Sequence, residues 1–354
     1  MRQPDSVPVV DLRDFSSADP QRRATFVQGL GQAIQSLGFV RVTGHPVTPE
    51  RIEPAYQAAR AFFALPERTK ERYHVPGGGG ERGYTPFGFE HAKDQLVPDL
   101  KEFWHVGREL DWAHPMAARY PRNLWPAEVA EFRPRLLSLY QALDEVGTSI
   151  LRALALYLEE PEETFTALAH EGNSILRPIH YPPVKGEFYI PGAVRAAAHE
   201  DINLITLLMT STSAGLELLT HDGTWMPANA QPGEILADTG DMMSRITNGV
   251  LPSTTHRVVN PPDGNSDRMS MPFFVHPRPD ALLAVPRAGF PHAGAGHHRR
   301  AVLAAAAAGD RAGGRGDRGG RLRAGGAQGL KVTPGEALRR PAPMRVQLGG
   351  FNRL

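Results

Sequence analysis

The spacing of apolar residues in the first 170 positions predicts a mixed α/β region. Residues 7–12 have the pattern of a short strand, and apolar positions repeat every three or four residues through 26–37, which indicates a helix that Gly38 ends. Residues 39–42 predict a second strand. Between 129 and 158 the helical spacing continues much longer, so we expect one long amphipathic helix packed against a sheet.

From residue 175 to about 279 the pattern changes to short apolar runs separated by turn residues every 8–12 positions, which is typical of a sandwich or barrel. His221-Asp222-Gly223 predicts a tight hairpin turn, because Asp-Gly readily adopts positive φ angles. One helical turn, 241–248, interrupts the series. We therefore predict a mixed α/β, mainly β fold: a double-stranded β-helix (jelly roll) core with flanking helices. The expected strands are 204–209, 215–220, 224–226, 233–238, 253–260 and 269–276.

These patterns divide the chain into four parts. We expect an N-terminal α/β region at 7–125, a long helix that packs on the barrel at 126–170, the jelly-roll core at 171–280, and a disordered low-complexity tail at 290–354. Gly, Ala and Arg supply 29 of the 40 residues from 291 to 330. Such a composition buries too little apolar surface to offset the entropy of ordering.

Charge separates the tail from the rest of the chain. Residues 291–354 hold 12 Lys and Arg against 3 Asp and Glu, whereas residues 1–290 hold 27 against 35. A basic tail can bind nucleic acid, but no aromatic residue lies between Phe290 and Phe351 to stack on bases, so we expect no nucleic-acid partner. The tail is either a solvated extension or the product of coding DNA read in a shifted frame.

Composition excludes several kinds of chemistry. The chain has no cysteine, which removes disulfides, zinc–thiolate sites, iron–sulfur clusters and cysteine nucleophiles. Pro4, Asp5 and Asp11 interrupt the first residues where a signal peptide needs an apolar stretch, and no apolar run is long enough to span a membrane. We expect a monomeric, cytoplasmic protein without a membrane partner.

Candidate metal ligands lie in the β-rich half. His199 and Asp201 are two residues apart at a predicted strand end and thus face the same way, although one such pair carries little weight alone. His256, on another predicted strand, adds a third donor. Two imidazoles and a carboxylate leave three open positions on an octahedral ion, as non-haem Fe(II) requires to hold an organic ligand and dioxygen, while tetrahedral zinc would keep only one.

Arg268 and Ser270 form the only Arg-x-Ser in the chain and share one face of the next predicted strand. An arginine buried among apolar residues costs several kcal/mol unless an anion meets it, and its planar fork suits a carboxylate. The partner is either a bound carboxylate ligand or an internal acid such as Glu234 or Asp238.

These motifs together resemble the isopenicillin N synthase-like branch of the Fe(II)/2-oxoglutarate-dependent oxygenases. The resemblance runs from about Val7 to Pro279. Two departures stand out: Ile179 replaces an Asn that many members carry, and no C-terminal helix is recognisable after residue 290. The matching segments are His199-Glu200-Asp201, Thr255-His256-Arg257-Val258-Val259-Asn260, Arg268-Met269-Ser270, His180-Tyr181-Pro182-Pro183 and residues 38–45.

The resemblance implies an oxidoreductase that couples oxidative decarboxylation of 2-oxoglutarate to hydroxylation, desaturation or ring closure of a small molecule of secondary metabolism, with release of succinate and CO2. Dioxygen is the second co-substrate. The implied Fe(II) ligands and catalytic residues are His199, Asp201 and His256, and the implied grip on the distal carboxylate of 2-oxoglutarate is Arg268, Ser270 and Tyr181. Because Asp201 occupies the position that chloride would need, we do not expect halogenation.

Aromatic residues from 83–89 and 99–107 are candidates for a substrate pocket, because these segments approach the barrel mouth in the family. They are Phe87, Phe103, Trp104 and His105. The alternative is that they are core packing between the N-terminal region and the barrel. His91, His105 and His180 are interpreted as structural or substrate-facing rather than metal-binding.

Two rival functions remain open at this stage. An iron oxidase of the same fold would draw its electrons from the organic substrate alone, and 2-oxoglutarate-dependent succinate release distinguishes it. A non-catalytic jelly roll could keep a metal for stability or sensing. Open coordination positions beside an anion-binding Arg-x-Ser argue against the second alternative.

Limited proteolysis tests the interpretation of the tail. Because it buries too little apolar surface to offset the entropy of ordering, the segment from Gly294 to Arg323 should be cleaved by trypsin before any site within 7–280. Fragment masses identify the cut sites, and a tail as resistant as the core would contradict both a solvated extension and a frameshift product. Resequencing the gene then decides between them, since a frameshift restores an aromatic-containing helix in another frame.

Overall fold

The computed structural model describes residues 6–91, 97–185, 190–262, 266–284 and 344–345. The helices are α1 Leu12–Phe15, α2 Pro20–Leu37, α3 Pro49–Phe63, α4 Glu67–Lys70, α5 Phe132–Tyr157, α6 Thr166–Ala169 and α7 Asp241–Ile246, with short 3-10 turns at Glu71–Tyr73 and Ala117–Arg119. The strands are β1 Val9–Asp11, β2 Phe39–Thr43, β3 Gly83–Thr85, β4 Glu102–Gly107, β5 Ile175–Leu176, β6 Ile179–Tyr181, β7 Ala196–His199, β8 Ile205–Met209, β9 Leu216–Leu219, β10 Trp225–Pro227, β11 Ile235–Thr239, β12 His256–Val258, β13 Arg268–Ser270, β14 Pro272–Val275, β15 Leu282–Leu283 and β16 Met344–Arg345.

Two sheets form the jelly-roll core. The larger runs in the order β1-β2-β11-β8-β14-β5-β4-β6-β13, with β3 paired to β4, and the smaller in the order β10-β9-β12-β7. Apart from the parallel pair β1–β2, the pairings within these two sheets are antiparallel. The prediction of a mainly β jelly roll with flanking helices is thus confirmed in its sheets and its helices.

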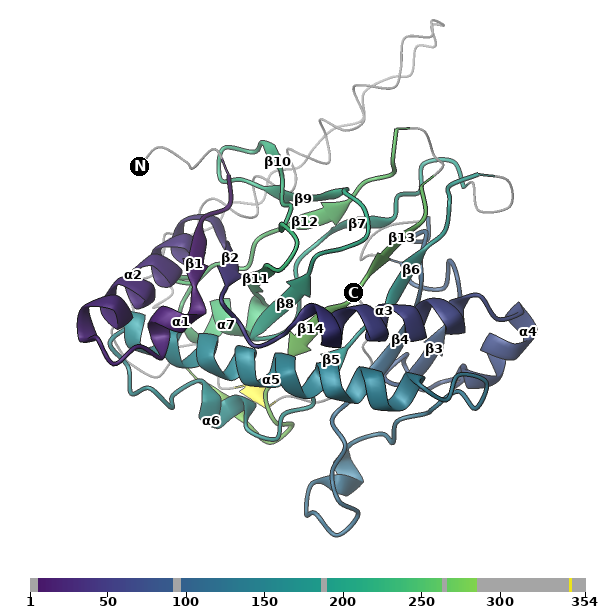
Figure 1. Ribbon diagram of the computed structural model, residues 1–354, viewed down its shortest axis with the longest axis horizontal. Coiled ribbons are helices and arrows are strands. Elements are labelled where there is room, and N and C mark those ends of the chain that lie inside the picture. Colours follow the sequence, from purple (N-terminus) through teal and green to yellow (C-terminus); the bar gives the residue numbers. More distant parts are fainter. Residues whose placement is uncertain (1–5, 92–96, 186–189, 263–265, 285–343, 346–354) are drawn as a thin grey trace, which may run out of the picture.

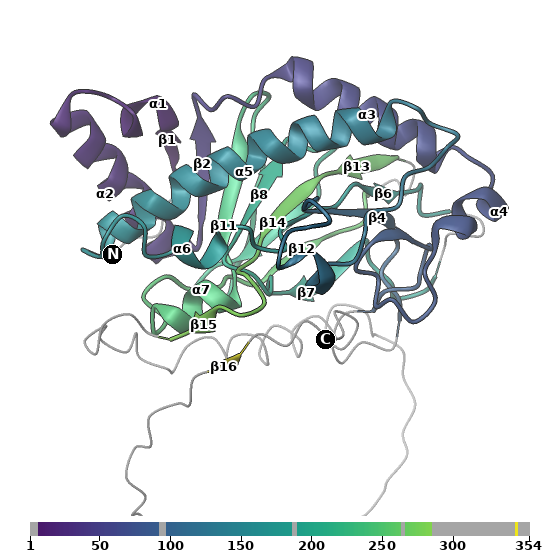
Figure 2. The same cartoon turned by 90° about the horizontal axis from the view of Figure 1, so that it is seen from below.

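Two long helices cover the outer face of the large sheet. Figures 1 and 2 show α3 and α5 side by side across β8 and β14, with β7 and β12 on the opposite side of these strands. The apolar face of α5 is buried, including Leu136, Leu143 and Leu154 at 0% exposure, and Gly147 lets the helix approach Val275 closely. This layer of helix on sheet is the main core, and it leaves the inner faces of the strands for the site.

The end of α2 is tied to the segment that carries His256. Gly38 has φ 75°, a left-handed conformation that ends the helix as expected. A Cβ at this position would lie 1.9 Å from the Oγ1 of Thr254, and that hydroxyl donates to the carbonyl of Leu37 at 3.1 Å. Only glycine therefore fits here, and the N-terminal helix is locked to the strand segment before β12.

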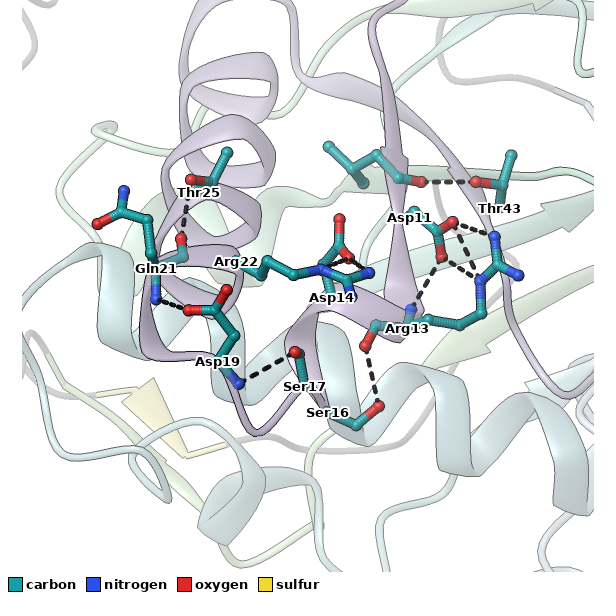
Figure 3. A network of polar contacts seen from close by, with 11 residues as sticks. Asp11, Arg13, Asp14, Ser16, Ser17, Asp19, Gln21, Arg22, Thr25 and Thr43 are labelled. Carbon is teal, nitrogen blue, oxygen red and sulfur yellow. Dashed lines mark hydrogen bonds and ion pairs between the residues drawn. The ribbon is translucent and has the colours of Figure 1, made fainter.

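Figure 3 shows how polar contacts fasten the first strand and two helices together. Asp11 caps α1 by accepting from the backbone N–H of Arg13 at 3.0 Å, and Asp19 caps α2 by accepting from Gln21 at 2.9 Å. Thr43 on β2 donates to the carbonyl of Val10 on β1 at 3.2 Å. These bonds hold β1 at the edge of the large sheet.

Two predicted strands differ from the structure. Residues 253–260 form a strand only at His256–Val258, and residues 269–276 divide into β13 and β14, which pair with different neighbours. The division arises because β13 leaves β14 at Met271 to pair with β6. The predicted tail lies outside the described residues except for β16, which pairs with β15. In the described part of the chain, no helix is long and apolar enough to cross a membrane.

Candidate metal centre and co-substrate site

Three donors meet between β7 and β12. His199 and His256 are directly opposite each other in the antiparallel register, and their ring centroids are 4.4 Å apart. Oδ1 of Asp201 lies 3.8 Å from the Nε2 of each histidine. Ligand atoms that share an ion at about 2.0–2.2 Å lie about 3–4 Å apart, so the group can hold a metal ion without rearrangement.

The backbone orients both imidazoles. Nδ1 of His199 lies 2.7 Å from the carbonyl oxygen of Ala197, and Nδ1 of His256 lies 3.1 Å from that of Thr254. A carbonyl only accepts, so each Nδ1 carries the proton and donates. Each Nε2 is thereby left with its lone pair toward Asp201, which is the tautomer that a metal needs.

Asp201 is held from two sides. Its Oδ2 accepts a hydrogen bond from the hydroxyl of Thr206 on β8. Its carbonyl accepts from the backbone N–H of Asp241, at the start of α7, at 2.8 Å. This approach requires Gly240, because a Cβ there would lie 2.5 Å from the same carbonyl oxygen. The carboxylate is therefore fixed by the fold, with Oδ1 facing the histidines.

Burial and neighbouring groups shift the pKa values of His199 and Asp201. Burial lowers the pKa of His199 to about 4, and the neighbouring His256 acts in the same direction. Burial by itself would raise the pKa of Asp201, but His256 and His199 outweigh it and lower that pKa. At neutral pH the site therefore offers a neutral imidazole at His199 and an ionised carboxylate, the forms that bind a divalent cation.

Arg268 presents a buried cation on β13. The residue is 1% exposed, its Nε donates to the carbonyl of Ser213 at 3.2 Å, and its Nη1 is buried without a partner. Among the described residues it forms no ion pair, and Glu234, one of the two internal acids considered above, pairs instead with Arg41 at 3.3 Å. In the described part of the chain this guanidinium therefore has no anionic partner.

The register of β13 with β6 gathers the other predicted residues. Arg268 is opposite Tyr181, and Ser270 is opposite Ile179. The guanidinium carbon lies 4.9 Å from the centre of the Tyr181 ring. Arg268, Ser270 and Tyr181 therefore lie together, as the sequence motifs predict.

A histidine bridge holds this strand pair. Nδ1 of His180 lies 2.7 Å from Glu102, and Nε2 lies 2.6 Å from Asp267, the neighbour of Arg268. Burial alone would lower the pKa of His180, but the hydrogen bonds to Asp267 and Glu102 outweigh it and raise that pKa. A protonated ring donates at both nitrogens, so His180 has a structural role and does not face the metal centre.

The aromatic residues predicted to line the substrate pocket do not all lie on the same face of the sheet. Phe103 and His105 share one face of β4, and Phe103 packs with Ile179 and Tyr181. Trp104 points the other way and is fully buried, 4.7 Å from the ring of Phe62. Trp104 is therefore core packing, as the alternative interpretation held. Phe87 lies partly buried between β3 and β4.

Sequence reasoning missed three residues on the inner face. Arg177 precedes β6, and Phe274 and His276 occupy alternate positions on and just after β14. The two-residue period of a strand could have identified Arg177. Side chains two residues apart share a face, so Tyr181, Ile179 and Arg177 are expected to point the same way. The same two-residue period, continued from Arg268 and Ser270, reaches Phe274 and His276.

Comparison with known proteins places the chain in a family. The model "non-haem dioxygenase in morphine synthesis N-terminal" matches residues 7–128, and the model "2OG-Fe(II) oxygenase superfamily" matches residues 172–277. A 2-oxoglutarate-Fe(II) type oxidoreductase of Aspergillus fumigatus is 30% identical over 289 residues, which are 79% of this chain and 85% of that protein. The chain belongs to the 2OG-Fe(II) oxygenase superfamily. It is a 2-oxoglutarate-dependent dioxygenase, and its cofactor and co-substrates are Fe(II), 2-oxoglutarate and dioxygen.

Solved structures agree with this assignment of the dioxygenase. A 2OG-Fe(II) oxygenase family protein from Caulobacter crescentus is 39% identical, with a TM-score of 0.71, over 86% of this chain and 99% of that one. A full-length protein of Neurospora crassa, solved in complex with α-ketoglutarate and thymine, is 26% identical, with a TM-score of 0.71, over 87% of this chain and 99% of that one. Members of this fold thus bind small molecules together with 2-oxoglutarate.

The position of Trp104 leads to a stability prediction. Trp104→Ala should lower the free energy of unfolding by about 3–5 kcal/mol, because it leaves a cavity among packed rings. The control Trp112→Ala removes a side chain of a residue that is 84% exposed, and should change it by less than about 0.5 kcal/mol. Urea denaturation measures both. Equal stability of the two variants would contradict the assignment of Trp104 to the core.

Proposed function

We propose that this dioxygenase binds Fe(II) through His199, Asp201 and His256, and binds the distal carboxylate of 2-oxoglutarate through Arg268, Ser270 and Tyr181. The observation that carries the proposal is a buried guanidinium with no ion pair in the described chain, in the same barrel as an open three-donor group. Either feature alone is compatible with a purely structural role. Together they supply a metal and an anion site inside one barrel.

The donor set fits Fe(II). Two imidazoles and one carboxylate on one side of an ion leave the opposite side to ligands from solution, and no thiolate is present to favour a soft metal. The side chain of His199 is 37% exposed, so the donor group remains reachable. When bound, Fe(II) supplies the redox chemistry by which dioxygen is activated at the expense of 2-oxoglutarate.

The residues of the chain position the reactants. Arg268 offers a planar fork for a carboxylate, and it can be rigid because Ser213 already holds its Nε. The Thr206 hydroxyl and the start of α7 hold Asp201, while backbone carbonyls hold the two histidines. Holding every group before ligands arrive lowers the entropy that must be lost on binding.

We also propose that the primary substrate is a small organic molecule of secondary metabolism, oxidised by hydroxylation, desaturation or ring closure, and that the enzyme acts as a monomer. Binding of thymine by the Neurospora relative supports a small substrate. A buried Arg268 with no ion pair in the described chain fits a carboxylate ligand such as 2-oxoglutarate.

Loss of a metal donor is the first test. His256→Ala should weaken Fe(II) binding by about a hundredfold or more and abolish succinate release, while the melting profile of the metal-free protein remains cooperative. Asp201→Gly should keep some iron, since two imidazoles remain, yet lose hydroxylation. Calorimetric titration with Fe(II) under anaerobic conditions measures affinity.

The matched control for the metal test is His170→Ala. The His170 side chain is 72% exposed at the end of α6, and its removal should leave Fe(II) affinity as in the wild type. Normal iron affinity and activity in His256→Ala would contradict the assignment of His256 as an Fe(II) ligand.

Removal of the proposed anion anchor is the second test. Arg268→Leu should raise the 2-oxoglutarate concentration for half-maximal succinate release by about a hundredfold, equivalent to about 3 kcal/mol. Arg268→Lys should recover only part of this, since a point charge does not reproduce the fork. Ser270→Ala and Tyr181→Phe remove one hydroxyl each, so about 1–2 kcal/mol is expected.

Stability provides an independent measure for Arg268→Leu. Without 2-oxoglutarate the variant should be at least as stable to urea as the wild type, because it removes a buried charge that has no ion pair in the described chain. The control Arg152→Leu removes a half-exposed arginine that pairs with Glu163, and should leave 2-oxoglutarate use unchanged. Unaltered 2-oxoglutarate dependence in Arg268→Leu would contradict the assignment of Arg268 as the carboxylate anchor.

A further inference from the structure

A second inward-facing arginine, Arg177, lies on the segment that leads into β6, the strand that carries Tyr181 of the proposed co-substrate site. Arg177 stands two residues before Ile179 and four before Tyr181, so in an extended chain the three side chains share one face. Its backbone N–H bonds to the carbonyl of Pro272 at 2.9 Å, which fixes it next to the start of β14. Arg177 has no part in the proposed binding of Fe(II) or 2-oxoglutarate.

Two aromatic rings and a histidine hold the Arg177 guanidinium. Its central carbon lies 4.7 Å from the centre of the Phe103 ring and 4.8 Å from that of the Phe274 ring. Its Nε donates to Nε2 of His105. Burial, and next the charge of Arg177, keep the pKa of His105 well below its usual value, so that ring is neutral and accepts this bond while its Nδ1 bonds to the carbonyl of Gly80.

The nearby carboxylates of Glu90 and Asp99 bond to Lys101. Lys101 is 6% exposed, and its Nζ lies 2.6 Å from Glu90 and 2.8 Å from Asp99. Glu90 also forms a long ion pair with Arg177, in which its Oε2 lies 3.9 Å from Nη1, beyond hydrogen-bond distance. Among the described residues, the two terminal nitrogens of Arg177 therefore donate no hydrogen bond, although Nε does.

The open side of Arg177 lies near the metal centre. The Phe274 ring beside the guanidinium belongs to a residue on β14 that lies directly opposite Thr206 of β8, and the Thr206 hydroxyl holds Asp201. The Arg177 side chain is 18% exposed, which leaves it accessible to a ligand. The two aromatic rings stack near the guanidinium, so a ligand group meets it edge-on, in the plane of its N–H bonds.

We propose that Arg177, clamped by Phe103 and Phe274, anchors the primary substrate through an sp² oxygen, either a carboxylate or a conjugated ring carbonyl. The inference rests on the proposed function, since it takes Fe(II) and 2-oxoglutarate to occupy the residues assigned above. Arg177 determines which small molecules bind beside the metal. It excludes substrates whose nearest group is an amine or a hydrocarbon, because these leave its donors unpaired.

Matched pairs of small compounds test this anchor. Thymine, L-proline and benzoate carry the oxygen, whereas pyrrolidine and benzyl alcohol repeat the rings of two of them without it. Each is added to the protein loaded with Fe(II) and 2-oxoglutarate under anaerobic conditions, and binding is measured by the change in melting temperature. A second readout is stimulation of succinate release after oxygen is admitted.

We expect at least one compound with an sp² oxygen to bind the wild type, and pyrrolidine and benzyl alcohol, which lack an sp² oxygen, not to bind. Arg177→Leu should weaken this binding by about tenfold to a hundredfold, and Arg177→Lys should restore only part of it. Phe274→Leu removes one side of the clamp without removing the charge and should weaken binding by a smaller factor. Arg152→Leu, far from the clamp on the outer helix α5, should bind like the wild type.

Three results would overturn the proposal. One is failure of thymine, L-proline and benzoate all to bind the wild type. Another is a larger shift in melting temperature with pyrrolidine or benzyl alcohol than with these three compounds. The third is unchanged binding in Arg177→Leu. If Arg177→Leu does not fold, Phe274→Leu decides, and unchanged binding in it counts against the clamp. Absence of succinate from the wild type would instead contradict the proposed function, while the melting-temperature shifts still test Arg177.

Discussion

The antiparallel pairing of β7 with β12 is the constraint on which the rest of the site depends. It places His199 directly opposite His256, and backbone carbonyls two residues earlier on each segment determine which ring nitrogen carries the proton. Asp201 completes the group only because α7 and Gly240 approach the loop after β7 closely. The metal donors are therefore positioned by strand register and backbone hydrogen bonds, which persist when a side chain is replaced.

A second pairing, β6 with β13, positions two inward-facing arginines, one on β13 and one just before β6. Arg268 and Arg177 both face inward, and both keep terminal nitrogens without a hydrogen-bond partner in the described chain. Arg268, which is fully buried, reduces the stability of the empty protein, since burying an unsatisfied charge costs several kcal/mol. The helices α3 and α5 offset this cost by burying a large apolar layer on the outer face. The outer face of the sheet thus contributes the stability, and the inner face carries the groups proposed to bind ligands.

Much of this organisation was predictable from the sequence, for specific reasons. The long helix and the ending of α2 at Gly38 follow from local spacing and from the positive φ of glycine. The strand motifs identified His199, Asp201, His256 and Arg268 because period-two spacing puts the members of each motif on one face. What local pattern could not predict was long-range: the change of pairing partner at Met271, the neutral His105 and the inward position of Arg177 all depend on partners far along the chain. Trp104 was ambiguous for the same reason, because both faces of β4 are buried.

The central claim is that one barrel holds Fe(II) and 2-oxoglutarate as adjacent ligands. Anaerobic titration of the Fe(II)-loaded protein with 2-oxoglutarate tests it most directly, because direct chelation of the ion by the keto acid produces a weak visible charge-transfer band. The account predicts that this band grows and saturates at equimolar 2-oxoglutarate, and that it is absent in the His256→Ala protein. Binding of both ligands to the wild type without any such band would contradict it.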